Sequence, residues 1–481
     1  MGVSKMYDRS QTFSGEALNR IHDASIDLLE TVGVRFDDDE AVGLFKSNGF
    51  KVDGKTVFFV EKNIRRALET VPSKFKLVAR NPVKSVAIGG DDFALVPGYG
   101  ASFITSNGGV QREATLADYH KFCQLVQTSK VINVNGFMMV SPRDLQADTA
   151  HMEMLYANII YCDKPFMGSP LSRKAARDCI NMLGIVWGSL EKLKEMSLTA
   201  SLITPLSPFR FTAEMAASII ELARYNQACI FGALVMAGSS GPMSLAGLLA
   251  QQNAEILAGV TLTQLVNPGA PVIVGGTSAI MDMRTGCLAM GAPEVSRLTS
   301  ATIQMAKFYN LPARAGCSNT DAHLADAQAG FESALTLMTA IRNGTNFVLH
   351  AAGILGSYSA MSFEKFMIDE ELCRMVIETL KPITITAESI DTDFIKEVGI
   401  GGDYLMQTKT LEQCRTAFFL PDLVNRKGYS AWQADGHKRI DEKAAEVLDD
   451  RLSSYIKPDI DPQIEKDLRA YIQKASRALA G

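Results

Sequence analysis

The residues best suited to chemistry lie where short apolar runs of the chain end. His350 closes the run that begins at Asn346, and Gly353 and Tyr358 follow it closely. A histidine at the end of a buried strand and before a glycine-rich loop can bind a ligand or move a proton, with a structural hydrogen bond as the alternative. We predict His350 as the catalytic residue and as a substrate contact.

Aromatic side chains follow the ends of other runs. Tyr99 lies between two glycines, Phe137 follows another glycine, and Tyr358 comes soon after His350. Carboxylates are scarce there, Asp321 being the nearest, so the paired carboxylates of glycosidases have little support. An aromatic, weakly charged pocket suits a cation that cannot donate hydrogen bonds, because cation–π contact is then its main attraction. We predict all three aromatic residues as substrate contacts, with core packing as the alternative for Phe137.

Two other groups at the run ends show weaker patterns. Gly275 and Gly276 could bind a phosphate through their backbone amides, but they lack the spacing of a Walker or dinucleotide loop. Thiol and imidazole groups could hold zinc, without the usual Cys-x-x-Cys or His-x-x-x-His spacing. This zinc alternative uses Cys317 and His350, with Cys287 or His323 added.

Eight apolar runs must position these side chains. Each run is followed by Gly, Pro, Ser or Asn and then by a longer amphipathic segment. This alternation is typical of a parallel α/β fold, and eight strand–helix units that close on themselves form a (β/α)8 TIM barrel. Such a barrel gathers the carboxyl ends of its strands around one pocket. The runs are Phe93 to Val96, Val131 to Asn135, Pro165 to Gly168, Leu198 to Ile203, Ala228 to Leu234, Pro271 to Val274, Pro312 to Gly316 and Asn346 to His350.

Helices are expected between and after these runs, because apolar residues recur there at helical spacing. They are predicted at Leu116 to Val126, Ala175 to Val186, Ala213 to Tyr225, Leu245 to Leu265, Val295 to Phe308, Leu324 to Ile341 and Phe363 to Leu380. We assign residues 93–382 to the barrel, which carries the active site.

The two ends of the chain have other patterns. Helical spacing over residues 14–32, 38–47 and 61–69, with a hairpin at 52–60, predicts an N-terminal α+β lobe over residues 1–92. Beyond Pro382 the chain is more polar, with helices at 444–455 and 464–478. We predict that residues 383–481 form a C-terminal helical extension packed on the barrel.

Composition limits the class of protein. A chain of 481 residues, 47% of them hydrophobic, can bury a large core. Its net charge of -5, without a basic cluster, disfavours nucleic acid as a partner. There is no apolar run of roughly 18 residues for a membrane helix, and the polar stretch from Met1 to Gln11 lacks the core of a secretory signal. Eight scattered cysteines favour reduced thiols, so we expect a cytoplasmic protein.

Motifs spread in order over nearly the whole chain resemble those of the trimethylamine methyltransferase family. They are residues 28–34 (LLETVGV), 291–294 (GAPE), 311–316 (LPARAG), 326–332 (DAQAGFE), 346–353 (NFVLHAAG) and 363–366 (FEKF). The trimethylamine enzymes of this family contain pyrrolysine, whereas this chain has only standard residues. It is therefore more similar to the members that demethylate quaternary amines such as glycine betaine.

The resemblance implies a (β/α)8 barrel whose mouth receives a methylated amine on one side and a corrinoid protein on the other. It implies that Co(I) of the partner's corrinoid takes a methyl group from the quaternary amine, which leaves as a neutral tertiary amine without a general acid. Because the corrinoid (cobalamin) belongs to the partner, no tightly bound cofactor is expected. Glycine betaine, proline betaine and carnitine are all open as substrates, and a homo-oligomer is expected.

On this reading the predicted residues divide into two groups. The aromatic residues form a cage around the cation: Tyr99, Tyr358 and Phe137. The polar residues bind or orient the carboxylate of the substrate: His350, Gly275, Gly276 and Thr277. Arg314 could pair with that carboxylate if it points inward, but we expect it to point outward, in a solvated or interhelical ion pair.

Two alternatives stand beside this hypothesis. One is a zinc-dependent corrinoid methyltransferase, in which a metal on Cys317 and His350 would activate the substrate as a Lewis acid. The other is a non-catalytic betaine-binding protein.

Overall fold

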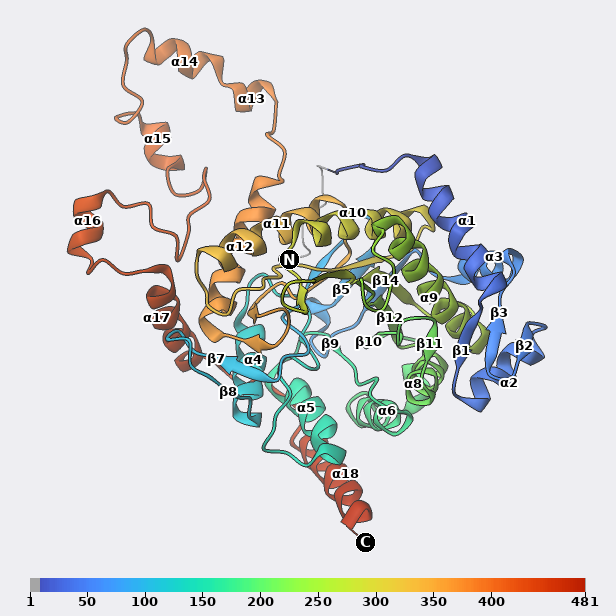
Figure 1. The fold of residues 1–481 in the computed structure, drawn as a ribbon. Coiled ribbons are helices and arrows are strands. Elements are labelled where there is room, and N and C mark those ends of the chain that lie inside the picture. The colour runs from blue at the N-terminus through green and yellow to red at the C-terminus, as the bar shows by residue number, and fades with distance from the viewer. Residues whose placement is uncertain (1–8, 481) are drawn as a thin grey trace.

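Seven short parallel strands form the central sheet of the protein, whose structure is a computed structural model that describes residues 9–480 (Figure 1). Most of the stretch from Met1 to Gln11 lies outside these residues. The strands lie in the order β6, β18, β17, β14, β12, β10, β9, so the first and the last along the chain are neighbours. They are β6 (Ala94–Leu95), β9 (Phe166–Met167), β10 (Thr199–Ile203), β12 (Ala228–Ala233), β14 (Val272–Gly276), β17 (Ala313–Gly316) and β18 (Phe347–Leu349).

Residues 132–135 connect the two edges of this sheet. Leu95 of β6 forms a parallel bridge with Ile132, and Phe166 of β9 forms one with Asn135. The amide of Asn133 donates to the carbonyl of Leu95, and the amide of Met167 donates to that of Asn135, both at 2.9 Å. The predicted run at residues 131–135 thus lies between the edge strands, as bridges rather than a regular strand. The other seven predicted runs are confirmed as strands.

A helix follows each of these eight segments and covers the outer face of the sheet (Figure 1). The helices predicted from periodicity are confirmed, with ends that shift by a few residues. One helix, α5, was not predicted: it is buried on nearly all sides, so its apolar residues form no stripe. The eight are α4 (Leu116–Thr128), α5 (Ala147–Tyr161), α6 (Arg173–Trp187), α8 (Ala213–Arg224), α9 (Leu245–Val266), α10 (Pro293–Phe308), α11 (Ala327–Arg342) and α12 (Phe363–Thr379).

The N-terminal segment packs on α9 and shares a sheet with a loop of the central fold. Strand β11 (Arg210–Phe211), which follows β10, pairs in parallel with β1. Helix α9 is buried on almost every face because it lies between the central sheet and the N-terminal helices. The N-terminal elements are α1 (Gly15–Thr31), β1 (Val34–Phe36), α2 (Asp39–Ser47), β2 (Lys51–Asp53), β3 (Thr56–Phe58), α3 (Glu61–Thr70), β4 (Lys74–Leu77), η1 (Pro82–Lys84) and β5 (Val86–Gly89).

Small strands in the loops that follow the central strands form two further sheets. One has the order β19, β20, β7, β8, and the other β13, β15, β16. They fix the loops at the carboxyl end of the central sheet. These elements are β7 (Phe103–Thr105), β8 (Gln111–Glu113), β13 (Met236–Ala237), β15 (Ala279–Asp282), β16 (Cys287–Ala289), β19 (Ile354–Leu355) and β20 (Ala360–Met361); a short helix, α7 (Leu190–Leu193), follows α6.

The C-terminal part has two portions that differ in packing. Helix α17 (Ile440–Ser453) lies against α12 and α4, and α18 (Pro462–Ala480) lies against α5 and α6. Residues 381–436, which we call the C-terminal arm, extend away from the body between α12 and α17 (Figure 1). The arm holds α13 (Ala387–Ile390), α14 (Thr392–Val398), α15 (Thr408–Gln413) and α16 (Tyr429–Ala434), and Leu423 is its one buried residue. No helix within residues 9–480 is long and apolar enough to cross a membrane.

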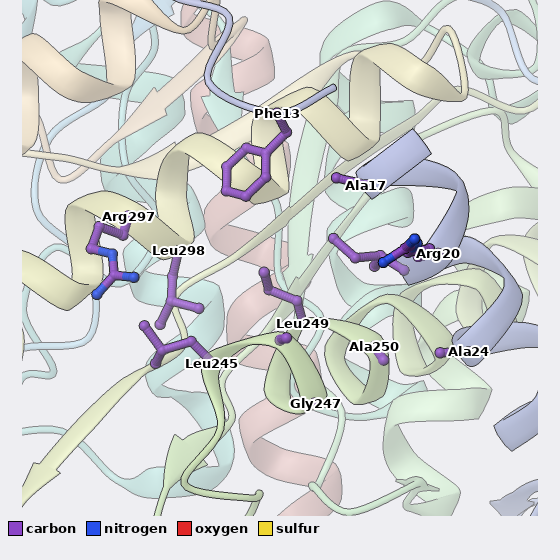
Figure 2. A pocket seen from close by; sticks show the side chains of 12 residues that line it. Phe13, Ala17, Arg20, Ala24, Leu245, Gly247, Leu249, Ala250, Arg297 and Leu298 are labelled. Carbon is purple, nitrogen blue, oxygen red and sulfur yellow. The ribbon is translucent and has the colours of Figure 1, made fainter. Parts of the chain in front are cut away.

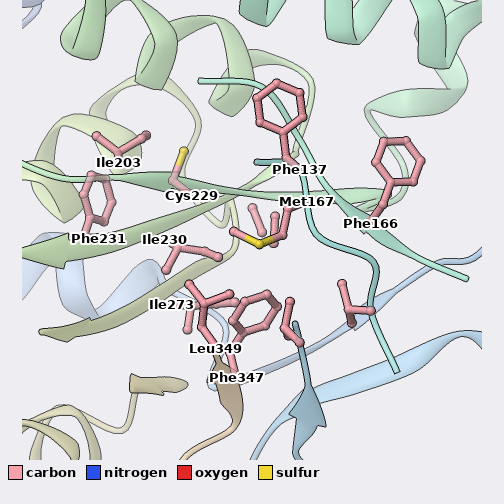
Figure 3. Packing of buried hydrophobic residues seen from close by; sticks show 14 of the residues in the cluster. Phe137, Phe166, Met167, Ile203, Cys229, Ile230, Phe231, Ile273, Phe347 and Leu349 are labelled. Atoms are coloured by element: carbon pink, nitrogen blue, oxygen red, sulfur yellow. The ribbon is translucent and has the colours of Figure 1, made fainter. Parts of the chain in front are cut away.

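Side chains of the central strands form an apolar core. Figure 3 shows the side chains of Met167, Ile230, Ile273 and Leu349 gathered beside Phe347, all of them fully or almost fully buried. Strands buried on both faces explain why the runs in the sequence are apolar without alternation. Polar chemistry is therefore left to the carboxyl ends of the strands.

Candidate active site

His350 ends strand β18 and is the centre of the candidate site. Its backbone has φ 64°, a left-handed conformation that is uncommon for residues other than glycine. Its amide donates to the carbonyl of Pro97, after β6, at 3.3 Å. The side chain is buried, and its ring stacks on Tyr358 with centroids 4.3 Å apart and planes at 26°. Two of the predicted residues are therefore in direct contact.

Gly316, at the end of β17, lies in close contact with polar side chains. A Cβ atom at this position would lie 3.1 Å from Tyr358 Oη, 3.1 Å from Asn319 Nδ2 and 3.2 Å from His350 Nδ1. A side chain at this position would press on these groups, so glycine allows them to approach the end of the strand. Asn319 was not among the predicted residues.

Buried polar atoms without a partner gather at this place. Within residues 9–480, ten buried side-chain nitrogen and oxygen atoms have no hydrogen-bond partner, and seven come from the central strands or from the segments directly after them. Four of these are Arg314 Nε, Asn319 Oδ1, His350 Nδ1 and Tyr358 Oη. An unpaired buried polar atom is costly, so a group of them indicates a ligand site. We call these four residues and Tyr99 the strand-end cluster.

Arg314 points into the fold, which corrects the prediction that it points outward. Only 1% of its surface is exposed, and Nη1 donates to the carbonyl of Gly276 at 3.3 Å. The strand register pairs Arg314 with Gly275, and Gly275 with Gly232. Of these two glycines, Gly275 lies against the backbone of Arg314 and Gly232 lies beside its guanidinium. A Cβ at Gly232 would lie 3.8 Å from Arg314 Nη1.

Arg314 carries the formal charge of the cluster. Burial, and then the positive charge of Arg314, hold the pKa of His350 well below its ordinary value, while a backbone hydrogen bond with Tyr99 opposes them. Burial also raises the pKa of the Tyr99 and Tyr358 hydroxyls. These three side chains are therefore uncharged at neutral pH.

The two loops around the cluster hold a strained backbone. Ser318, His350, Ser357 and Tyr358 all have positive φ, between 47° and 77°. Each of these conformations is costly for a residue that is not glycine, and such residues concentrate at functional sites. The loops also bond to each other, since the amide of Ser357 donates to the carbonyl of Thr320 at 2.9 Å.

A layer of buried polar residues holds these loops from behind. Lys365 of α12 pairs with Asp369 at 2.6 Å, and both side chains are at most 2% exposed. Asp369 accepts from the amide of Gly353 at 2.8 Å, and Lys365 donates at 2.9 Å to Ser333. Ser333 in turn donates to the carbonyl of Ser318 at 3.0 Å. The motif at residues 363–366 thus supports the loops after β17 and β18.

Glu332, in the motif at residues 326–332, has a similar role. Its carboxylate accepts from the hydroxyl of Thr320 at 2.6 Å and from the amide of Asp321 at 2.9 Å. Asp321 itself accepts from the amide of Met290 at 2.6 Å and from Ser357. These carboxylates therefore stabilise loops, in keeping with the predicted scarcity of catalytic acids.

The remaining predicted polar contacts lie in β14 and directly after it. A Cβ at Gly275 would collide with the carbonyl of Arg314, and a Cβ at Gly276 would collide with Gln252 of α9. Close packing thus explains both glycines. The amide of Thr277 donates to the carbonyl of Ala233 at 2.9 Å, so this backbone donor is already in use.

The remaining predicted aromatic residues differ in burial. Tyr99 follows β6 and is partly buried. Phe137 is fully buried in the main hydrophobic core (Figure 3), and its carbonyl accepts a hydrogen bond from the hydroxyl of Tyr119. Tyr99 is the better placed of the two for a ligand at the strand ends.

The thiol of Cys317 is engaged with the backbone. Its Sγ donates to the carbonyl of Leu349 at 3.1 Å, and burial raises its pKa well above the ordinary value. Within residues 9–480, no group of three His, Cys, Asp or Glu side chains is arranged to hold a metal ion. The zinc hypothesis therefore gains no support from the geometry.

A separate apolar cavity of about 500 Å³ lies on the outer side of the fold. It is lined by Phe13 and by residues of α1, α9 and α10, including Arg20, Leu249 and Leu298 (Figure 2). Its lining includes no residue of the strand-end cluster.

Comparisons with known proteins cover the whole chain. The family described as "Trimethylamine methyltransferase (MTTB)" matches residues 2–480. The glycine betaine methyltransferase of Desulfitobacterium hafniense (strain Y51) is 40% identical over 475 residues, which are 99% of this chain and 99% of that protein. The proline betaine:corrinoid methyltransferase of Eubacterium limosum is 31% identical over 465 residues, 93% of this chain and 94% of that protein. The crystal structure of the Methanosarcina barkeri monomethylamine methyltransferase aligns over 91% of this chain and 98% of that chain, with a TM-score of 0.49 and 10% identity.

Proposed function

This chain belongs to the trimethylamine methyltransferase family, as its motifs predict, and we propose that it moves a methyl group from glycine betaine, or a related betaine, to the Co(I) corrinoid of a partner protein. The observation that carries this proposal is the stacked, uncharged pair of His350 and Tyr358 at the strand ends, where buried polar atoms lack hydrogen-bond partners. The full-length similarity to a glycine betaine methyltransferase supports the choice of substrate.

The properties of His350 and the tyrosines suit a quaternary ammonium. Such a cation donates no hydrogen bonds, so faces of aromatic rings are its natural contacts. Tyr358 and Tyr99 form two sides of the proposed cage, and Phe137 is retained as a third candidate. A neutral imidazole at His350 also fits, because a charged one would repel the ammonium.

We assign His350 the positioning of the substrate at the reacting end of the site. Its unpaired Nδ1 and its fixed stacking on Tyr358 allow it to orient a bound ligand. The amine leaves as a neutral molecule, so no group of this chain has to deliver a proton. Catalysis by this chain then consists of binding, orientation and exclusion of water. The partner's corrinoid supplies the nucleophile that accepts the methyl group.

We propose that the fold is a complete (β/α)8 barrel with residues 131–135 as its second strand, which the bridges of Ile132 and Asn135 to the two edge strands support. On this division the N-terminal lobe is residues 1–92, the barrel residues 93–382 and the C-terminal extension residues 383–481. All eight cysteines are free thiols, which favours the reducing cytoplasm.

The C-terminal arm supports a homo-oligomer. Nearly half of the large apolar side chains exposed by the described residues belong to it, among them Ile400, Leu405 and Phe418. A transient partner would leave such a surface in water after each turnover, whereas permanent interfaces are the more hydrophobic class. We therefore assign the arm to contacts between copies of this chain.

Mixing the protein with a Co(I) corrinoid and one N-methylated compound at a time tests the function. Glycine betaine is expected to give the methyl-Co(III) spectrum, and proline betaine, carnitine and trimethylamine complete the series. The absence of a spectral change with all of them would overturn the proposal. His350→Ala and Tyr99→Ala are expected to weaken substrate binding while the protein stays folded, and normal binding by both variants would show that the site is wrong.

A further inference from the structure

Arg314 is a buried cation without an acidic partner, and we propose that it binds the carboxylate of the substrate and restricts the enzyme to zwitterionic quaternary amines. This inference rests on the proposed function, since it concerns the same substrate. It adds a specificity-determining residue at a position where the chain itself provides no counter-charge.

Three other buried or half-buried basic side chains of the protein have several partners each. Lys365 pairs with Asp369, and Lys164 donates to three backbone carbonyls at 2.6 to 2.7 Å. Arg173 contacts three carboxylates at 2.8 to 3.0 Å. Arg314 is more deeply buried than Arg173 or Lys164, yet it forms no ion pair with any described carboxylate. Its one hydrogen bond is long, at 3.3 Å, and Nε has no partner.

A buried charge without a partner is strongly destabilising. A protein can retain such a charge where a bound ligand of opposite charge pairs with it. The charged and titratable groups that act on Arg314 are Tyr358, Cys317 and Tyr99, and all three are neutral at neutral pH. His350, which feels the charge of Arg314, is neutral as well. The missing negative charge therefore has to come from a bound molecule.

The position of Arg314 connects this charge to the proposed cage. Arg314 and Gly316 are two residues apart in β17, so their Cβ positions face the same side of the sheet. Gly316 contacts the polar atoms of Tyr358 and His350, and Gly232 lies beside the guanidinium. One small molecule can therefore meet both the aromatic rings and the guanidinium.

Charge then decides which quaternary amines bind. A simple cation such as choline would place its ammonium near the guanidinium with no negative charge between them, and the two would repel. In a betaine the carboxylate lies a short distance from the ammonium and can accept two parallel hydrogen bonds from the fork of an arginine. Carnitine, also a zwitterion, meets the same requirement if its length fits.

The test is isothermal titration of the protein with glycine betaine and with choline, without corrinoid. Wild-type protein is expected to bind glycine betaine and to discriminate against choline. Arg314→Gln is expected to lower the affinity for glycine betaine by about 100-fold, the scale of one charged hydrogen-bonding partner. The affinity for choline should stay unchanged or increase. Arg314→Lys keeps the positive charge but not the forked guanidinium, so its affinity for glycine betaine should lie between those of wild-type protein and Arg314→Gln.

Arg80→Gln is the matched control. Arg80 is a largely buried arginine that also has unpaired nitrogens, but it lies beside Asp163 and Cys162, before β9, at the opposite end of the strands. Its substitution should leave both affinities unchanged. Circular dichroism of each variant establishes that it is folded.

The outcomes separate this inference from the proposed function. If wild-type protein prefers glycine betaine to choline and Arg314→Gln loses this preference, the inference is supported. This holds even if no methyl group is transferred to a corrinoid. Equal losses for glycine betaine and choline, no loss for either, or no binding of glycine betaine by wild-type protein would each overturn it. Methyl transfer that persists in Arg314→Gln with unchanged affinity would leave the proposed function intact and remove Arg314 from the site.

Discussion

The strand-end cluster and the C-terminal arm both contain side chains that lack the contacts usual for their chemistry, but of opposite kinds. The cluster hides polar atoms that lack hydrogen bonds, whereas the arm exposes apolar side chains that lack neighbours. A buried polar group is completed by a small ligand that brings the opposite charge or a hydrogen bond. An exposed apolar surface is completed by another protein surface. The cluster therefore indicates a small polar ligand, and the arm indicates a protein partner.

The two regions also differ in how firmly they are held. Behind the cluster, buried ion pairs and carboxylates fix loops whose backbone is strained, so the unpaired groups stay where a ligand can meet them. The arm has exposed ion pairs, which contribute little. Four variants, in order of decreasing expected effect, test this contrast.

Lys365→Met should have the largest effect, because it leaves Asp369 buried without its partner. The expected loss is about 3–5 kcal/mol of unfolding free energy, the usual cost of breaking a buried ion pair. Chemical denaturation measures it. Lys396→Met is the control, since this lysine pairs with Asp393 within one exposed helix of the arm and should show no measurable change. Equal stabilities of the two variants would mean that the support behind the cluster is not needed.

Tyr358→Ala removes one face of the proposed cage. The affinity for glycine betaine should fall about tenfold, the scale of one desolvated cation–π contact, and calorimetry measures this change. Tyr358→Phe keeps the ring and should retain most of the affinity. Tyr404→Ala, in the exposed arm, should have no effect. If Tyr358→Phe binds as poorly as Tyr358→Ala, the hydroxyl rather than the ring is the contact.

His350 should make stability depend on pH. Its pKa in the folded state is lowered, so as the pH falls below about 6.5 the unfolded chain takes up a proton that the folded protein does not. Stability contributed by the neutral imidazole is thus present above that pH and is lost below it, by at most about 1.4 kcal/mol per pH unit. His350→Asn should flatten this part of the curve of melting temperature against pH. His437→Asn, at an exposed histidine that also has positive φ, should leave it unchanged.

Ile400→Asp together with Leu405→Asp should have the smallest effect on the site. Both side chains are exposed in the arm, so substrate affinity should not change. The oligomeric state is the quantity expected to respond, and light scattering after size-exclusion chromatography measures it. A wild-type protein that is monomeric at all concentrations would contradict the assignment of the arm to self-association.

Periodicity located the strands and most helices because burial on one or both faces leaves a regular trace in the sequence. It missed α5, which is covered on all sides and so shows no preferred face. It also predicted one extension packed on the barrel over residues 383–481 and did not separate the exposed arm from it, since nothing in the local sequence distinguishes a helix packed on the body from one that extends away from it. Asn319 was missed for a related reason: its proximity to Gly316, Tyr358 and His350 arises only when the loops fold over the strand ends.

Motifs in order along the chain identify the family, and the apolar run from Asn346 places His350 at its end. Only the tertiary structure decided the direction of Arg314. A residue in the middle of a strand has its face set by alternation, but when both faces are apolar the sequence does not reveal which is the inner one. Arg314 is buried, and its guanidinium lies beside Gly232 and donates to the carbonyl of Gly276, so it points into the fold.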